Sequence, residues 1–415
     1  MTPTGGGKRR HGWPIALLLG FVLLSGGVLM LRPQSPSLDD LKKTVAALGK
    51  LPFKADVPVR YLTRREMEDY LLKLFAADYP AELAGREETF LEWMGFSGRI
   101  DLRKLRRQII LESVGGLYNE KSKELLCLEE YRTVDAVNTM ALVHELRHAV
   151  LDQYFPLGRL LGEGSDFDDR RLAVLAAIEG DATHLMIAQT GFDPDIIIDS
   201  FNPEVLLSLA PQGSPSFADA PPILRRQLIM PYVAGLKFIH RAIAKKGKKV
   251  LDVFRRPPLS SKQILHPEAY FRDEQPPPVS IVCAPPGFVR YHEGVIGEYY
   301  LNTLLAPDAP DADPAQGWCN DRFEILRRGQ ATLLIWKSLW EDEKTAARVA
   351  ADFRRAIERQ FAVTFAPGTM GGQPFLAARG GAGYFLLKPD GRTIFYVRTD
   401  SREEMNRLIA AGDFR

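Results

Sequence analysis

The sequence of 415 residues predicts an α+β protein: a mainly helical N-terminal part with a small sheet, then a smaller C-terminal α+β unit. Two runs, 135–154 and 170–186, predict largely apolar helices, because the first contains no Pro or Gly and the second is apolar nearly all round. Near the C-terminus, 343–360 predicts an amphipathic helix, and strands at 385–388 and 393–398 flank the turn sequence Pro-Asp-Gly-Arg. These patterns favour mixed helix and sheet.

Three segments are expected along the chain. Residues 1–34 would form an N-terminal tail and membrane anchor, 35–255 the mainly helical domain and 256–415 the C-terminal lobe, because about 380 residues exceed a typical single domain. The other elements expected, in order, are helical structure over 57–112 with a break at Pro80, a hairpin over 115–130, a loop over 190–222, a helix over 223–244, an irregular Pro-rich stretch over 257–286, a helix over 297–305 and paired strands over 323–336.

The N-terminal segment predicts a transmembrane helix. Residues 13–31 carry no charge, and at about 1.5 Å per residue they span roughly 30 Å of bilayer. Basic residues cluster before this run, at 8–10, so we expect the N-terminus in the cytoplasm and residues 33–415 on the periplasmic or extracellular side of the cell membrane, as a single-pass protein. A cleaved signal peptide is the alternative, although no small-x-small cleavage site ends the run.

The most informative motif is His-Glu-Leu-Arg-His at 144–148. Residues four apart on a helix differ by only about 40° around the axis, so His144 and His148 would hold one metal ion together. Glu145 lies about 100° away and could hold a water whose pKa a zinc ion lowers to about 7. The motif therefore indicates metal-assisted hydrolysis; the alternative, a charged surface patch, fits poorly with the apolar helix.

A third ligand is expected from the second helix. Glu179 lies in the middle of this apolar run, where an unpaired carboxylate is unfavourable and a metal ion would remove the cost. Asp181 is expected to orient one of the histidines through its other ring nitrogen. The alternative for each of these two carboxylates is a salt bridge to an arginine. His184 lies on a different face of the helix from Glu179 and is expected to be a packing or surface residue.

The order of these motifs resembles the gluzincin class of zinc metallopeptidases. More narrowly, the chain is similar to a poorly characterised bacterial and archaeal family of zinc metallopeptidases that are often membrane-attached or secreted. The resemblance implies a zincin-like fold for residues 35–255, with every proposed ligand and the base intact; Cys319 stands where the family tends to have a small residue. The matching segments are 116–120, 144–149 with 152–155, 178–182, 264–270 and 317–323.

The resemblance also gives the expected hairpin a role. In zincin folds a strand of this kind lies near the site, and an extended peptide can pair with its edge. A second expectation concerns His266, in the sequence Leu-His-Pro-Glu, with His240, Tyr232 and Tyr270 nearby. Metallopeptidases often use a His or Tyr to stabilise the oxyanion, so His266 is an oxyanion candidate. The alternative is a histidine that fixes the turn at Pro267 by hydrogen bonds.

The cysteine count and the net charge argue against a disulfide-rich protein and against a nucleic-acid-binding protein. Three cysteines are too few for a disulfide framework, and the sequence leaves undecided whether Cys283 and Cys319 form a single disulfide. Cys127 is expected to be buried in a strand. The formal net charge is +2, which gives no electrostatic case for a nucleic acid as partner.

The sequence therefore predicts a membrane-anchored metallopeptidase with one Zn²⁺ per chain, held by His144, His148 and Glu179, and a peptide or protein substrate. Glu145 would be its general base. Two alternatives remain: a non-catalytic envelope scaffold or binding protein stabilised by zinc, and another metal-dependent amide hydrolase.

Overall fold

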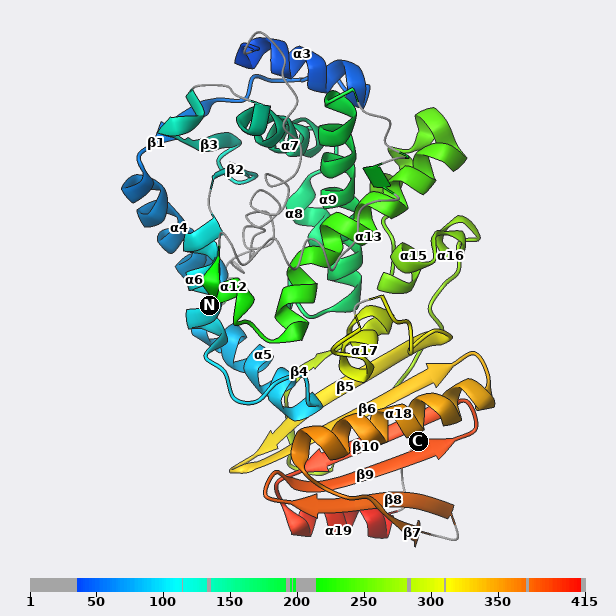
Figure 1. Cartoon of the computed structure of the whole chain (residues 1–415). Helices are drawn as coiled ribbons and strands as arrows, with labels where there is room; N and C mark the ends of the chain where they lie inside the picture. The colour runs from blue at the N-terminus through cyan, green and yellow to red at the C-terminus, as the bar shows by residue number, and fades with distance from the viewer. Residues whose placement is uncertain are drawn as a thin grey trace, which may run out of the picture.

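The computed structural model describes residues 36–113, 115–132, 136–191, 195, 197–198, 214–281, 285–309, 311–370 and 373–411. A helical region that contains a small three-stranded sheet lies against a seven-stranded sheet formed by the C-terminal part of the chain (Figure 1). The predicted mixture of helix and sheet is thus confirmed.

The helical region is built around α7, α9 and α13, and its two predicted apolar helices are confirmed as α7 and α9. Its helices in chain order are α3 (Leu38–Gly49), α4 (Arg64–Asp78), α5 (Ala81–Met94), α6 (Leu102–Ser113), η1 (Glu129–Arg132), α7 (Ala136–Asp152), α8 (Leu157–Leu161), α9 (Asp169–Gln189), α12 (Pro215–Ala218), α13 (Pro222–Lys246), η3 (Gly247–Lys249), α14 (Asp252–Arg255), α15 (Ser261–Leu265), α16 (Pro267–Phe271) and α17 (Gly297–Leu305).

The backbones of α9 and α13 touch directly. A Cβ on Gly180 would lie 2.2 Å from the carbonyl carbon and oxygen of Gly235, and a Cβ on Gly235 would lie 2.0 Å from the carbonyl oxygen of Ala176. Only glycine allows this approach, because any side chain would force the two helices apart. The contact fixes α9, and with it Glu179, between α7 and α13 (Figure 1).

The small sheet lies beside α7. Its strands β2 (Gly116–Asn119) and β3 (Glu124–Leu128) pair as the predicted antiparallel hairpin, and β1 (Val59–Leu62) joins β3 in parallel, in the order β1-β3-β2. The strand β1 corrects the prediction of helix from residue 57. Thr63 caps α4 through a capping box with Glu66, so the helix cannot extend backwards and the preceding residues are available for pairing.

The C-terminal sheet has the order β4-β5-β6-β10-β9-β8-β7 and is antiparallel throughout. Alternate residues of its central strands face different cores: Leu334 and Trp336 belong to the main core, whereas Leu333 and Ile335 belong to the second one, with residues of the terminal helix. The elements are β4 (Val289–Gly294), β5 (Trp318–Arg328), β6 (Ala331–Trp340), α18 (Glu343–Phe361), β7 (Ala366–Met370), β8 (Gln373–Gly380), β9 (Gly383–Asp390), β10 (Thr393–Thr399) and α19 (Arg402–Ala411).

The sequence predicted the central strands and missed the outer ones. The expected helix over 343–360 and the strands of β5, β6, β9 and β10 are present, while β4, β7 and β8 were not predicted. The strand β7, which contains Pro367 and Gly368, forms one edge of the sheet. An edge strand tolerates proline, so its sequence looks like a loop.

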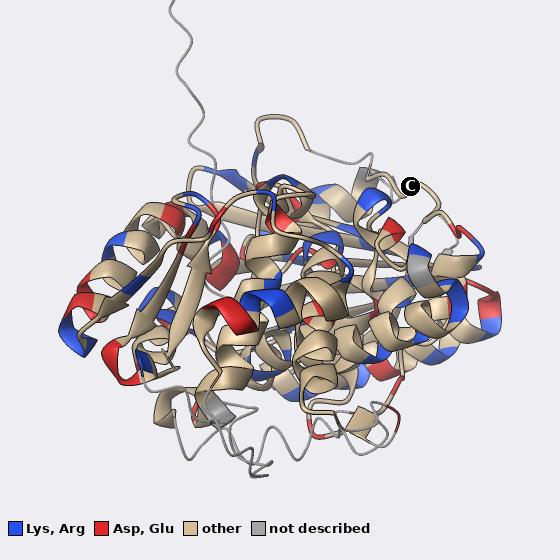
Figure 2. Cartoon of the chain, turned by 90° about the horizontal axis from the view of Figure 1, so that it is seen from above, with Lys and Arg blue, Asp and Glu red and all other residues tan. Residues whose placement is uncertain are grey.

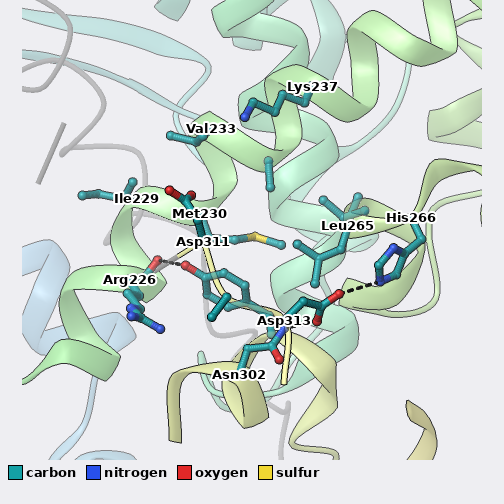
Figure 3. Close-up of a pocket in the computed structure, with 14 residues that line it drawn as sticks. Arg226, Ile229, Met230, Val233, Lys237, Leu265, His266, Asn302, Asp311 and Asp313 are labelled. Atoms are coloured by element: carbon teal, nitrogen blue, oxygen red, sulfur yellow. Dashed lines mark hydrogen bonds and ion pairs between the residues drawn. The ribbon is translucent and has the colours of Figure 1, made fainter. Parts of the chain in front are cut away.

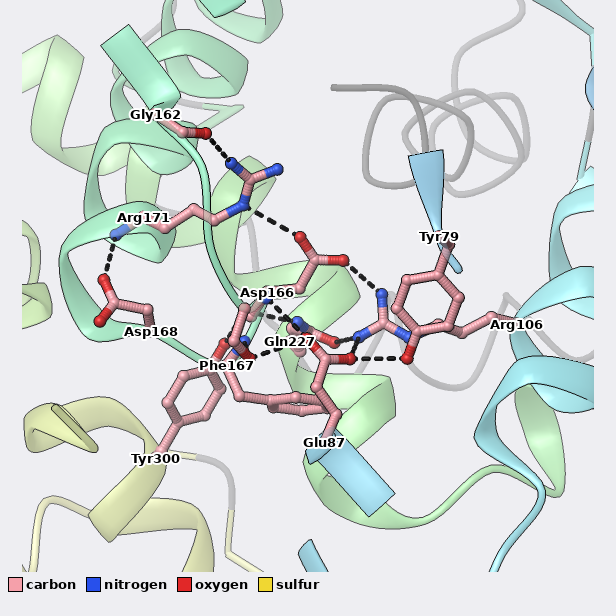
Figure 4. Close-up of polar contacts among 11 residues, drawn as sticks. Tyr79, Glu87, Arg106, Gly162, Asp166, Phe167, Asp168, Arg171, Gln227 and Tyr300 are labelled. Carbon is pink, nitrogen blue, oxygen red and sulfur yellow. Dashed lines mark hydrogen bonds and ion pairs between the residues drawn. The ribbon is translucent and has the colours of Figure 1, made fainter. Parts of the chain in front are cut away.

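A buried ion-pair network joins α5, α6, α13 and the segment before α9 (Figure 4). The guanidinium of Arg106, which is 2% exposed, lies 3.5 Å from the carboxylate of Glu87 and 2.5 Å from that of Asp166. It also donates to the side-chain oxygen of Gln227 at 3.2 Å. Four segments far apart in sequence therefore share one buried cation.

The prediction of a transmembrane helix requires correction. No helix within the described ranges is long and apolar enough to cross a membrane, against the predicted single-pass location at the cell membrane. The run assigned to that helix, 13–31, lies outside the described residues.

Basic and acidic residues are interspersed over the face of the molecule shown in Figure 2. This distribution accords with the formal net charge of +2 for the whole sequence.

Candidate metal centre

The two histidines of the 144–148 motif meet Glu179 between α7 and α9. The Nε2 atoms of His144 and His148 lie 3.0 Å apart, and Glu179 Oε2 lies 3.1 Å from the first and 3.5 Å from the second. All three side chains are buried. The structure therefore brings together the three residues that the sequence proposed as ligands, from positions 35 residues apart.

The arrangement fits a divalent metal ion. Ligand atoms about 2.0–2.1 Å from a tetrahedral ion are separated by roughly 3.3–3.4 Å, close to the distances observed. Glu179 has no exposed surface, and its second oxygen, Oε1, is buried without a hydrogen-bond partner. An isolated carboxylate oxygen of this kind is unfavourable in an apolar helix, and a cation between the three residues removes the cost. The hydrogen bonds of Glu179 are to the two histidines, not to an arginine as the alternative required.

The pKa values of the two histidines are shifted in opposite directions. Burial lowers the pKa of His144 and outweighs its hydrogen bond to Glu179. Burial also acts to lower the pKa of His148, but the charge and hydrogen bond of Glu179, together with the charges of Glu145 and Asp181, outweigh it, so the pKa lies above the usual value. The pKa of Glu179 is lowered despite its burial, because His148 and His144 favour the carboxylate. Glu179 is thus a charged acceptor in an otherwise apolar interior.

Glu145 is held by the small sheet. Its side chain is buried, and its Oε2 accepts a hydrogen bond of 2.7 Å from the backbone N–H of Tyr118 in β2. Burial raises the pKa of Glu145 to about 7, partly offset by the neighbouring His148. The carboxylate proposed as the base therefore lies beside the ligands with a fixed orientation.

Asp181 has a different partner from the one predicted. Its two oxygens accept from the guanidinium of Arg147, Oδ2 from Nε at 2.5 Å and Oδ1 from Nη2 at 3.2 Å. Arg147 also donates to the carbonyl oxygen of Gly49 at 3.4 Å. Asp181 thus ties α9 to α7 and to the end of α3, and its charge acts on His148 by raising the pKa of that residue.

Asp152, at the end of α7, was not assigned a role from the sequence. Its Oδ2 accepts from the hydroxyl of Tyr118 at 2.9 Å and from the Lys123 ammonium, and its Oδ1 accepts from the backbone N–H of Leu157 at 3.0 Å. Asp152 therefore fixes the hairpin that carries Tyr118 against α7. Its place in the segment 152–155, noted for its resemblance to the metallopeptidases, was the available signal.

Two further predicted residues lie in other surroundings. His266 contacts Glu298 and Asp313, and these contacts do not include the residues of the candidate metal centre. Tyr232, expected near His266, lies instead beside His144, with ring centroids 6.1 Å apart, and is buried on α13. His184 packs against His240 at a centroid distance of 5.7 Å, in line with a packing role.

Neither of the two described cysteines, Cys127 and Cys319, is among the residues of the candidate site. Cys127 is buried in β3, as predicted, and burial raises its pKa to about 12. Cys283, one half of the disulfide left open above, lies outside the described residues.

Comparison with known proteins reaches only the C-terminal part of the chain. A family model described as "Domain of unknown function (DUF8575)" matches residues 288–409. This segment corresponds to the seven-stranded sheet with α17, α18 and α19, and it covers less than a third of the chain. No curated protein and no solved structure matches. The matched segment contains none of the residues of the candidate metal centre.

Proposed function

We propose that this protein is a zinc metallopeptidase with a zincin-like helical region, in which His144, His148 and Glu179 hold one zinc ion and Glu145 is the general base. The observation that carries the proposal is the meeting of three ligand atoms from α7 and α9 within 3.5 Å of one another, with a buried carboxylate beside them. The order of the motifs, which resembles that of gluzincin metallopeptidases, supports the same conclusion.

A zinc ion supplies Lewis acidity, which polarises a carbonyl group and makes water more acidic. The residues of the chain supply the rest. Glu145 accepts the proton of the attacking water and returns it to the leaving amine, and the Tyr118 N–H keeps the carboxylate oriented for both transfers. Tyr232, beside His144, is better placed than His266 to act on the oxyanion.

The small sheet supports a peptide substrate. The strand β2 forms one edge of the sheet, and the Tyr118 N–H points from it to Glu145. An extended peptide paired with this edge would place its backbone next to the base.

One observation favours a second candidate, a non-catalytic scaffold or binding protein stabilised by zinc. His144 is 6% exposed, Glu145 3% and His148 0%. Structural zinc sites are closed in this way, whereas a catalytic site keeps one position open.

Substitution of the base distinguishes these candidates. The full chain and its Glu145→Gln variant are compared for zinc content, melting temperature and cleavage of a peptide library. Glu145→Gln should keep one zinc and the fold while turnover falls by about 10²-fold or more. His144→Ala and Glu179→Ala should each hold one zinc fewer than wild type, whereas Glu163→Gln, an exposed control, should change nothing.

The possible failures have separate meanings. Unchanged turnover in Glu145→Gln would remove the proposed mechanism. Zinc content equal to that of wild type in both His144→Ala and Glu179→Ala would remove the proposed ligand set. A wild-type protein that holds zinc and cleaves no peptide would favour the scaffold.

A further inference from the structure

A second group of metal-ligating side chains lies at the start of α17. His266 comes from the junction of α15 and α16, Glu298 from the first turn of α17 and Asp313 from the segment that follows this helix. The Nε2 of His266 lies 3.1 Å from Glu298 Oε1 and 3.5 Å from Asp313 Oδ2, and the ligand atoms of the three residues all lie within 4.8 Å of one another. The two distances from His266 Nε2 match the two from Glu179 Oε2 in the first site, 3.1 Å and 3.5 Å.

Glu298 is the residue that points to a bound cation. It has no exposed surface, and its second oxygen, Oε2, is buried without a hydrogen-bond partner. Burial raises the pKa of Glu298, because the charged form loses its solvation and only His266 compensates for it strongly. An ion in contact with the carboxylate would satisfy the isolated oxygen.

A second layer of hydrogen bonds orients the Asp313 carboxylate and fixes the backbone at His266. Asn302, one turn after Glu298 on α17, donates to Asp313 Oδ1 at 2.6 Å, and the Asn302 amide oxygen accepts from the N–H of Ala315 at 2.7 Å. The backbone N–H of His266 donates to the carbonyl of Lys262 at 2.8 Å. Ligands oriented by such partners are typical of built metal sites.

The cluster opens on one side into a cavity of about 250 Å³ (Figure 3). His266 and Asp313 line this cavity, and most of its other wall is apolar, including Met230 and Leu265. The side chains of His266 and Asp313 are 34% and 33% exposed, so an ion could enter and keep coordination positions open to the cavity. Lys262, a cation whose charge acts on His266, is paired with Glu274 at 2.6 Å, which reduces its opposition to a second positive charge.

We propose that His266, Glu298 and Asp313 form a second divalent-cation site, independent of the candidate zinc centre and open to this cavity. One imidazole and two carboxylates suit a first-row divalent ion such as Zn²⁺ or Mn²⁺. Two carboxylates also balance the charge of such an ion. The competing arrangement is a protonated His266 held by the two carboxylates with no metal.

Zinc stoichiometry in the full chain tests the proposal. The protein is stripped with a chelator, exposed to micromolar Zn²⁺, passed over a desalting column and analysed for metal. The background His144→Ala/His148→Ala removes the first site, so the zinc that remains reports on the second. We expect one zinc per chain in this background and none after the further change His266→Gln. Asp311→Asn, in the same segment and also at the cavity, is the matched control and should keep the zinc.

Circular dichroism checks that each variant is folded, and Asp313→Asn replaces His266→Gln if the latter is not. Absence of zinc from the background chain, or equal zinc with and without His266, would overturn the proposal and favour the protonated histidine. The result is separable from the proposed function, because failure of the first site alone leaves wild type and background with the same single zinc.

Discussion

Replacing Arg106 by Met should destabilise the helical region strongly. The change keeps much of the aliphatic stem and removes the cation that faces Glu87 and Asp166 (Figure 4). Breaking a buried pair by removing one partner costs about 3–5 kcal/mol. Glu87, which is fully buried, retains three donors: the Tyr79 hydroxyl at 2.6 Å, the Ser165 hydroxyl at 2.8 Å and the Asp166 N–H at 2.9 Å.

These remaining donors place the expected loss near the lower end, at about 3 kcal/mol. Urea unfolding followed by circular dichroism measures it. Arg107→Met is the matched control, because Arg107 is exposed on the same helix, and its effect should stay within about 0.5 kcal/mol. Adding Glu87→Gln to Arg106→Met should cost less than Glu87→Gln costs alone, with a coupling of about 1–3 kcal/mol.

The loss of unfolding free energy in Arg106→Met relative to wild type should also grow as the pH rises. Burial raises the pKa of Glu87, and Arg106 opposes this rise, so the Arg106→Met variant raises the pKa further. A carboxyl whose pKa is raised in the folded state stabilises that state while protonated, and this contribution is lost as the pH rises through the folded pKa. The difference from wild type should therefore widen as the pH rises above the folded pKa of wild-type Glu87, which itself lies above the ordinary glutamate value of about 4.3. Equal stability of Arg106→Met and Arg107→Met, or a deficit that shrinks as the pH rises, would refute this reasoning.

Three further changes test other contacts. Gly235→Ala places a Cβ 2.0 Å from the carbonyl oxygen of Ala176, so it should lower the free energy of unfolding by about 1–3 kcal/mol or more and weaken zinc retention by displacing Glu179. Thermal melting and metal analysis measure these two effects. Gly158→Ala, with only Glu120 near its Cβ, is the control. Asp152→Asn should cost about 1.5–3 kcal/mol in a urea titration, because charge-assisted bonds to Tyr118 and Lys123 are lost, and an unchanged midpoint would contradict this role. Arg398→Met removes donors to the carbonyl oxygens of Glu92 at 2.9 Å and Trp93 at 3.1 Å, so the C-terminal sheet should become more sensitive to limited proteolysis. Arg379 is exposed, and Arg379→Met should leave the digestion pattern as in wild type.

Local periodicity made several elements predictable. The spacing of His144 and His148 fixes their common face on any α-helix, and the apolar run around Glu179 marks that residue as buried whatever packs against it. The helix α18 and the hairpin of β9 and β10 follow from amphipathic spacing and a turn sequence. These features depend on neighbours within a few residues, so the sequence by itself determined them.

Contacts between distant segments were decided by the tertiary structure. Tyr118 reaches Glu145 from 27 positions away, and β1 pairs with β3 although its sequence reads as the start of a helix. Asp181 pairs with Arg147 rather than with a histidine, and His266 meets Glu298 and Asp313 from two other elements. No periodicity encodes such meetings, because they depend on how helices and strands pack. The direct contact between Gly180 and Gly235, for example, sets the position of α9 only when both helices have formed.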